Sequence, residues 1–156
     1  MLYIACSLKQ VQFSMLMEVY LEGNQEKPCT LLEAEQDFYH YLQAVFFPTH
    51  GAYYAIWVEK GQYVSALRME PYRDGVLLAA LETAPHCRCR GYGKSLIKAV
   101  LSQEKKVYSH VAKDNLPSLR VHEACGFQRI SQQAVYLDGS VNDRCYTLCY
   151  ERAGGC

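Results

Sequence analysis

The feature of this sequence that most constrains its fold is a glycine-rich, basic junction between an apolar strand and an amphipathic helix. The strand is predicted over residues 76–83 and the helix over residues 91–103. The junction holds two glycines and three basic residues: Gly91, Gly93, Arg88, Arg90 and Lys94. A strand that feeds a helix in this way is typical of layered α/β sheets, which hold ligands where strands end and helices begin. The junction therefore constrains both the fold class and the position of a binding site.

The remaining hydrophobic periodicities place this junction in the middle of a mixed α/β fold. Before it we predict a strand at 2–5, a helix from residue 8 to about residue 23, a helix between Pro28 and Pro48, and strands at 52–58 and 63–68. After it we predict a strand at 107–111, a helix at 117–125, and closing antiparallel strands at 128–137 and 145–150. This order is typical of a mixed α/β sheet and excludes a helical bundle or an all-β sandwich.

Length and composition limit the classes of protein that this chain can be. Its 156 residues allow one compact domain, which we predict to span residues 1–156, and half of them are hydrophobic. Sixteen basic residues balance 16 acidic ones at a pI near 6.9, so we expect no nucleic-acid partner. The longest purely apolar run, residues 76–81, is too short to cross a bilayer, so we expect no membrane partner either.

The cysteines and the start of the chain suggest a cellular compartment. The first residues lack the basic start and the long apolar stretch of a secretory signal. The eight cysteines show no C-x-x-C spacing, and no two histidines have the spacing of a zinc finger. We therefore expect reduced thiols, no bound metal and a cytoplasmic location.

The junction has the chemistry of an anion-binding loop. Glycines let successive backbone N–H groups point at one ligand, and the following helix directs its positive end to the same place. The basic side chains add charge-assisted donors, so a pyrophosphate is the expected ligand. Two nucleotide-binding motifs are each excluded by one residue. The Walker A motif needs glycine where this chain has Arg88, and the dinucleotide-binding motif needs glycine where it has Leu96.

Two motifs together resemble the GNAT superfamily of acyl-CoA-dependent N-acyltransferases. Arg88-x-x-Gly91-x-Gly93, after a strand that ends near Thr83, is similar to the superfamily's loop for the pyrophosphate of coenzyme A. The second motif contains Asn115-Leu116-Pro117-Ser118, then His122, then Gly126-Phe127. It resembles the superfamily's next motif, in which an asparagine after a strand precedes a helix that ends in Gly-Phe. The two motifs span residues 83–127, and the predicted elements on either side follow the superfamily's order.

The resemblance implies a fold and a set of residues that bind coenzyme A. The fold is α/β (α+β), a mixed, mostly antiparallel twisted sheet of about seven strands with about four flanking helices and a splayed central strand pair. The pantetheine arm is expected in the gap between the splayed strands, and a backbone N–H near Thr83 is expected to polarise the thioester carbonyl. The implied cofactor-binding residues are Leu81, Thr83, Arg88, Cys89, Arg90, Gly91, Tyr92, Gly93, Lys94, Ser95, Asn115 and Ser118.

The resemblance leaves the proton-transfer residues open. A tyrosine commonly stands seven residues after the asparagine in the superfamily and protonates the departing thiolate, but this chain has His122 there. Histidine can donate a proton near neutral pH, so His122 is one catalytic candidate. The alternatives are Tyr92, a neighbouring residue or no side chain at all. The candidates for the base are His110, five residues before Asn115, and Glu82 on the splayed strand, where strand alternation turns it away from Leu81 and Thr83 unless a bulge intervenes.

The sequence thus predicts an N-acetyltransferase that moves an acetyl group from acetyl-CoA to a primary amine of a small molecule or peptide. Transfer is expected by direct attack in a ternary complex, with acetyl-CoA as co-substrate and no metal. The alternative is a non-catalytic acyl-CoA-binding sensor or regulatory module, which the histidine at position 122 favours. The acceptor is expected among the first two helices, the turn at 70–74 and the hairpin at 136–144. An exposed final strand makes a homodimer possible.

Overall fold

The computed structural model describes residues 1–20 and 28–154 of the chain, including the side chains of all of these except residues 28–32. Their centre is a seven-stranded sheet in the order β1-β2-β3-β4-β5-β9-β6. The strands are β1 (Leu2–Ala5), β2 (Tyr53–Glu59), β3 (Gln62–Tyr72), β4 (Gly75–Thr83), β5 (Lys106–Ala112), β6 (Gln128–Ser131) and β9 (Cys145–Glu151). A separate small hairpin pairs β7 (Ala134–Val135) with β8 (Val141–Asn142). Neighbouring strands in the sheet are antiparallel except β4 and β5, which are parallel.

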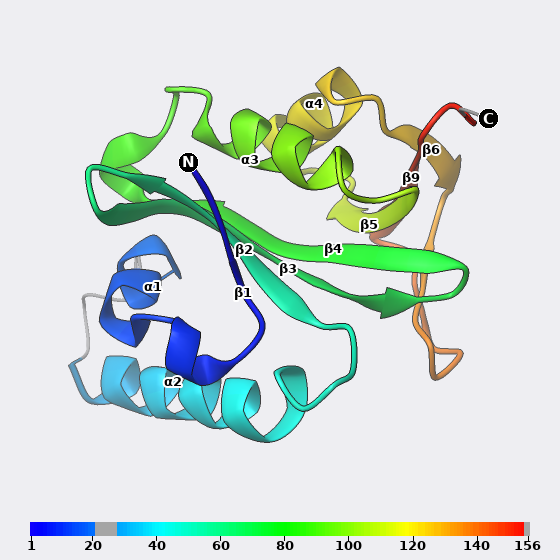
Figure 1. Ribbon diagram of the computed structural model, residues 1–156. Coiled ribbons are helices and arrows are strands. Elements are labelled where there is room, and N and C mark those ends of the chain that lie inside the picture. The colour runs from blue at the N-terminus through cyan, green and yellow to red at the C-terminus, as the bar shows by residue number, and fades with distance from the viewer. Residues whose placement is uncertain (21–27, 155–156) are drawn as a thin grey trace.

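Helices cover both faces of the sheet (Figure 1). On one face lie α1 (Phe13–Tyr20) and α2 (Pro28–Tyr41), and α2 continues into a π-helical turn, η2 (Leu42–Phe46). On the other face lie α3 (Tyr92–Leu101) and α4 (Leu116–Ala124). Each face has its own apolar core, one under α1 and α2 and one under α3 and α4. The predicted fold class, a mixed and mostly antiparallel sheet with flanking helices, is confirmed.

Burial from both sides explains why the central strands do not show a simple alternation of apolar and polar residues. Residues 63–67 of β3 are all buried, because helices pack against both faces of that strand. Each helix contributes one apolar stripe. In α3 the buried residues are Leu96, Ile97, Val100 and Leu101, which follow the helical repeat.

Two predicted elements differ from the observed ones. The helix predicted from residue 8 begins as a 3-10 turn, η1 (Leu8–Gln10), and is interrupted at Val11, whose extended backbone leads into α1. The predicted end of that helix, near residue 23, lies outside the described residues. The strand predicted over 128–137 is split: β6 pairs with β9, whereas β7 turns away after Ser131 and pairs with β8. The Asp138-Gly139 turn therefore joins β7 to β8.

The parallel pair β4 and β5 opens along its length, as predicted. It is paired only from Val76 to Leu78, against Val107 to Ser109, although both strands continue further. At the closed end, Gly75 brings β4 so close to β5 that a Cβ there would lie 2.4 Å from the carbonyl oxygen of Lys106. At the open end, β4 contains a bulge where its pairing with β3 shifts register, and Ala80 adopts a left-handed φ of 53°. The closed end and the bulge together create a gap between two adjacent strands of the sheet.

No helix in the described part of the chain is long and apolar enough to cross a membrane.

Candidate active site

The glycine-rich junction forms a concave loop at the carboxyl end of β4. A short 3-10 turn, η3 (Pro85–Cys87), follows the strand, and Cys89 and Gly91 then take left-handed φ values of 62° and 81°. Gly91 is the N-cap of α3, so the first N–H groups of that helix have no partner within the helix. A Cβ at Gly91 would meet no atom within 4 Å and would project into open space. The loop therefore presents backbone donors and the positive end of a helix dipole to one hollow.

That hollow is a cavity of about 750 Å³. Ten of the twelve predicted cofactor-binding residues line it: Leu81, Thr83, Arg88, Cys89, Gly91, Tyr92, Gly93, Lys94, Asn115 and Ser118. The other two, Arg90 and Ser95, do not line it. The cavity also touches Glu82, which the sequence analysis named as a candidate base, Pro117 of the second motif, and Cys87 and Val121.

A second, smaller cavity of about 170 Å³ lies between the splayed strands. It is lined by residues 78–81 of β4, residues 109–112 of β5 and three residues of α4 and its cap, Asn115, Ser118 and His122. It shares Leu81, Asn115 and Ser118 with the larger cavity. The cavity at the glycine-rich loop and the strand gap are therefore adjacent.

Asn115 fixes the start of α4 beside both cavities. It is the N-cap of that helix, and its Oδ1 accepts a hydrogen bond of 3.2 Å from the backbone N–H of Ser118. Asparagine is favoured at this position because its side chain satisfies one of the free donors of the first turn. The predicted second motif therefore marks a helix start at the edge of the strand gap.

His122 is buried, with 1% of its surface exposed. Its Nδ1 lies 2.7 Å from the carbonyl oxygen of Ser118, so this nitrogen carries the proton and donates it. Its Nε2 lies 2.9 Å from Oγ of Ser109 and accepts a hydrogen bond from that hydroxyl. Desolvation lowers the pKa of His122, although the bond to Ser118 opposes this effect. The imidazole is therefore neutral at pH 7, and both of its nitrogens have protein partners.

His110 lies on the opposite face of β5 and lines the strand gap. Its ring is packed between Tyr72 and Tyr136, with ring centroids 5.4 and 5.3 Å away, and its Nε2 is 3.4 Å from Oη of Tyr72. The Tyr72 hydroxyl donates to the carbonyl oxygen of Val135, which ties the β7–β8 hairpin to this site. Desolvation, and then the positive charge of Arg73, lower the pKa of His110. At pH 7 it is a neutral imidazole that can accept a proton.

Glu82 pairs with the anion-binding loop. Its carboxylate oxygen Oε2 lies 3.7 Å from a guanidinium nitrogen of Arg88, and both side chains are about half exposed. Nε of Arg88 also donates to the carbonyl oxygen of Thr83, at 3.2 Å. Arg88 therefore ties the loop back to the end of β4, and Glu82 shares in that link.

Sequence reasoning also missed the residues of the bulge. Ala79 and Ala80 line the strand gap, and Ala80 has the left-handed backbone that opens it. Alanine has no preference for a left-handed φ, so nothing in its identity predicts the bulge. Oη of Tyr20 donates to the carbonyl oxygen of Ala80 at 2.7 Å, which connects α1 to this point.

The expected acceptor segments divide into two groups. The hairpin of β7 and β8 reaches the strand gap through Tyr136 and Val135. Asp74 lies instead at the closed end of the β4–β5 pair, where it accepts a hydrogen bond from Tyr108 and pairs with Lys106 at 2.9 Å. These two partners lower the pKa of Asp74 to about 2. The turn at 70–74 therefore lies away from the opening between the strands.

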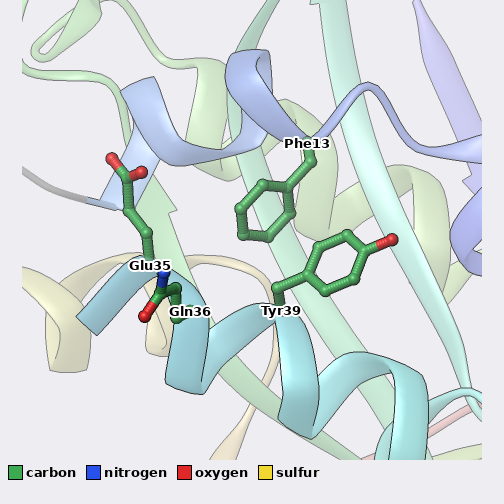
Figure 2. A pocket seen from close by; sticks show the side chains of 4 residues that line it. All are labelled: Phe13, Glu35, Gln36 and Tyr39. Atoms are coloured by element: carbon green, nitrogen blue, oxygen red, sulfur yellow. The ribbon is translucent and has the colours of Figure 1, made fainter. Parts of the chain in front are cut away.

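A separate hollow of about 360 Å³ lies between the start of α1 and the middle of α2. The rings of Phe13 and Tyr39 line it in edge-to-face contact, with ring centroids 5.1 Å apart and ring planes at 89°, while Glu35 and Gln36 come from α2 (Figure 2). It shares no lining residue with the strand gap or the anion-binding cavity.

Several solved structures of acetyltransferases have a similar fold. A GNAT-family acetyltransferase from Bacillus cereus ATCC 10987 aligns over 99% of both chains with a TM-score of 0.64 and 16% identity. The PaiA N-acetyltransferase from Thermoplasma acidophilum, solved with coenzyme A, aligns over 97% of this chain and 99% of its own, with a TM-score of 0.64 and 10% identity. The ribosomal-protein-S18-alanine N-acetyltransferase from Escherichia coli aligns over 100% and 97%, with a TM-score of 0.62 and 12% identity. At these identities the likeness establishes the fold.

The family follows from the sequence. The family model described as the acetyltransferase (GNAT) family matches residues 14–127, which is most of the chain. The protein therefore belongs to the GNAT acetyltransferase family and is an acyltransferase enzyme. No curated protein matches the chain in sequence.

Proposed function

We propose that this enzyme transfers an acetyl group from acetyl-CoA to a primary amine of a small molecule or peptide, by direct attack in a ternary complex. The observation that carries the proposal is the junction of two cavities: an anion-binding loop next to a gap between splayed strands. Coenzyme A has a matching shape, with a pyrophosphate at one end and a narrow pantetheine arm that leads to the thioester. The assignment to an acetyltransferase family favours this enzyme over a non-catalytic binding module.

The residues at the loop fit a pyrophosphate. Gly91 has a left-handed backbone and leaves free the space that a Cβ would fill, so a phosphate can approach the start of α3 closely. Lys94 lines the same cavity and supplies a positive charge. Asn115 and Ser118, at the border of the two cavities, would line the pantetheine arm.

The open side of β4 supplies the group that would polarise the thioester carbonyl. The N–H of Ala84 donates to Val64 of β3, so by strand alternation the N–H group of Thr83 points away from β3, toward the gap. A backbone N–H aimed at the developing oxyanion typically contributes about 3 kcal/mol to transition-state stabilisation. We assign this role to the segment 81–83 of β4.

We assign the role of base to His110. An alkylammonium has a pKa of about 10 and must lose its proton for the nitrogen to form the amide bond while the C–S bond breaks. His110 is a neutral imidazole in the gap, whereas Glu82 is paired with Arg88. His122 has both nitrogens bonded within the protein, so we assign it a positioning role that joins α4 to β5.

Initial rates with acetyl-CoA and a panel of primary amines test the proposal. We expect amine-dependent release of the free thiol of coenzyme A, equal in amount to the acetylated amine identified by mass spectrometry. Direct attack in a ternary complex predicts intersecting double-reciprocal plots as both substrates are varied. Parallel plots, or acetyl transfer to the enzyme in the absence of amine, would contradict direct attack. Saturable binding of acetyl-CoA without any turnover would contradict the proposed reaction itself.

A further inference from the structure

The two ring nitrogens of His110 have different surroundings. Nε2 lies 3.4 Å from Oη of Tyr72, and Nδ1 has no hydrogen-bond partner among the described residues. A neutral imidazole carries one proton, on either nitrogen, and only the other nitrogen can accept a second one. The position of that proton therefore decides which atom of His110 can act as a base.

The hydroxyl group of Tyr72 determines which ring nitrogen of His110 is protonated. This hydroxyl has a single hydrogen, and it donates that hydrogen to the carbonyl oxygen of Val135, which can only accept. Oη of Tyr72 therefore meets Nε2 of His110 with a lone pair. A lone pair on Nε2 would be repelled at this contact, whereas an Nε2–H group is attracted. The geometry thus favours the tautomer with a proton on Nε2 and none on Nδ1.

The β7–β8 hairpin holds this arrangement in place. The rings of Tyr72 and Tyr136 pack edge-on against the imidazole of His110, with ring planes at 83° and 87°. Tyr136 belongs to the hairpin that also accepts the Tyr72 hydrogen bond. Oγ1 of Thr147 on β9 donates to the carbonyl oxygen of Gln133 at 2.7 Å, which fixes the start of the hairpin to the sheet. The contact that selects the tautomer is therefore built from packed elements of the fold.

We propose that Tyr72 is a positioning residue, which holds His110 as the Nε2–H tautomer and so makes Nδ1 the atom that takes the proton of the acceptor amine. This inference rests on the proposed acetyl transfer and on His110 as its base. In the proton transfer, an N–H bond of the alkylammonium breaks, an Nδ1–H bond forms, and the electron pair stays on the amine nitrogen for attack on the thioester. The imidazolium that results keeps its Nε2–H bond to Tyr72, now as a charge-assisted bond.

Nitrogen-15 NMR of the histidine rings measures the tautomer directly. The protein is labelled at its five histidines, and the signals of His110 are assigned by their loss in His110→Gln. At alkaline pH, where the ring is neutral, we expect the chemical shifts of a protonated Nε2 and an unprotonated Nδ1. In Tyr72→Phe the preference is lost, so the shifts of the two nitrogens should move toward each other as both tautomers become populated.

Steady-state kinetics tests whether Tyr72 acts through His110. Tyr72→Phe keeps the ring and removes only the hydroxyl, so we expect kcat to fall by about two- to tenfold, the factor of one net hydrogen bond, with KM for acetyl-CoA unchanged. Residues that act through one another have non-additive effects. Tyr72→Phe should therefore lower kcat no further in the His110→Gln protein.

The matched control is Tyr108→Phe. The Tyr108 ring packs against Tyr72 at a centroid distance of 5.1 Å, but its hydroxyl donates to Asp74 at the closed end of the strand pair. This variant also loses one tyrosine hydroxyl from the same group of rings, and it should leave both kcat and the His110 shifts unchanged.

Three results would overturn the proposal: a protonated Nδ1 in the wild type, identical ring nitrogen shifts in the wild type and Tyr72→Phe, or additive losses of kcat in the double variant. The spectra require no turnover. They therefore decide the tautomer, and the effect of Tyr72 on it, even if the proposed acetyl transfer fails.

Discussion

Two adjacent residues of β5, Ser109 and His110, point toward opposite faces of the sheet. Ser109 points toward α4 and bonds to His122, whereas His110 points toward the acceptor face and packs against Tyr72 and Tyr136. Burial lowers the pKa of both histidines, so each is neutral at pH 7. They differ in what their nitrogens can do. Both side chains line the strand gap, but both nitrogens of His122 are bonded to the protein, whereas among the described residues only Nε2 of His110 has a partner, Oη of Tyr72 at 3.4 Å.

The pH dependence of turnover tests the role of His110. Its pKa is lowered from 6.5 by desolvation and by Arg73, so kcat/KM should contain an ascending limb with a midpoint below pH 6.5. Arg73→Gln removes a positive charge that disfavours the imidazolium, so it should raise the pKa and move this limb to higher pH. The measurement is a pH profile of kcat/KM at constant ionic strength.

The companion variant is His110→Gln. In its pH profile of kcat/KM, the ascending limb should be absent. A limb that stays in place in Arg73→Gln, or that survives in His110→Gln, would assign the base to another group, with Glu82 as the next candidate.

At the scale of elements, the site depends on how α4 is held against β5. Asn115 begins the helix at the edge of the strand gap, and about two turns later His122 reaches back to β5 through Ser109. The same histidine bonds to the carbonyl oxygen of Ser118, in the preceding turn. A buried polar network of this kind fixes the position of one element on another when all of its members are satisfied. His122 therefore fixes the position of α4 where this helix lines the strand gap.

His122→Leu separates this positioning role from proton donation. The variant leaves the Ser109 hydroxyl without its partner, so we expect the free energy of unfolding to fall by about 1–3 kcal/mol. Loss of a general acid typically lowers kcat by about 10²–10⁴-fold. Under conditions where the variant is folded, we expect its kcat to fall by less than this. Chemical denaturation and initial rates are the two measurements. The exposed His50→Leu serves as the control.

A His122→Leu protein of unchanged stability whose kcat is at least about a hundredfold lower would instead make His122 the proton donor.

The elements also show where sequence reasoning succeeds. The strand, the glycine-rich loop and the helix of residues 76–101 are predicted because glycine and the apolar repeat have strong local preferences. The bulge at Ala80 and the split of β6 from β7 are not, because both arise from strand pairing between distant segments.

At the scale of the whole molecule, the layered fold places the two parts of the proposed site on opposite faces of the sheet. The glycine-rich loop begins α3 on one face, whereas His110 packs against Tyr72 and Tyr136 on the other. The gap between β4 and β5 connects the two faces of the sheet. A thioester held in this gap could be reached by an amine from the opposite face, which is the geometry that direct transfer requires.

The most direct test of this account is the affinity of the protein for acetyl-CoA, measured by isothermal titration calorimetry on the wild type, Gly91→Ala and Gly61→Ala. Both glycines have a left-handed φ, 81° and 76°, and neither would place a Cβ within 4 Å of another atom. The two substitutions therefore impose a similar backbone strain, of about 1–2 kcal/mol. Only Gly91 lines the anion-binding cavity, whereas Gly61 lies in the turn between β2 and β3. The account predicts that Gly91→Ala weakens binding by about tenfold or more and that Gly61→Ala binds like the wild type. Equal affinities in all three proteins, or no binding by the wild type, would contradict it.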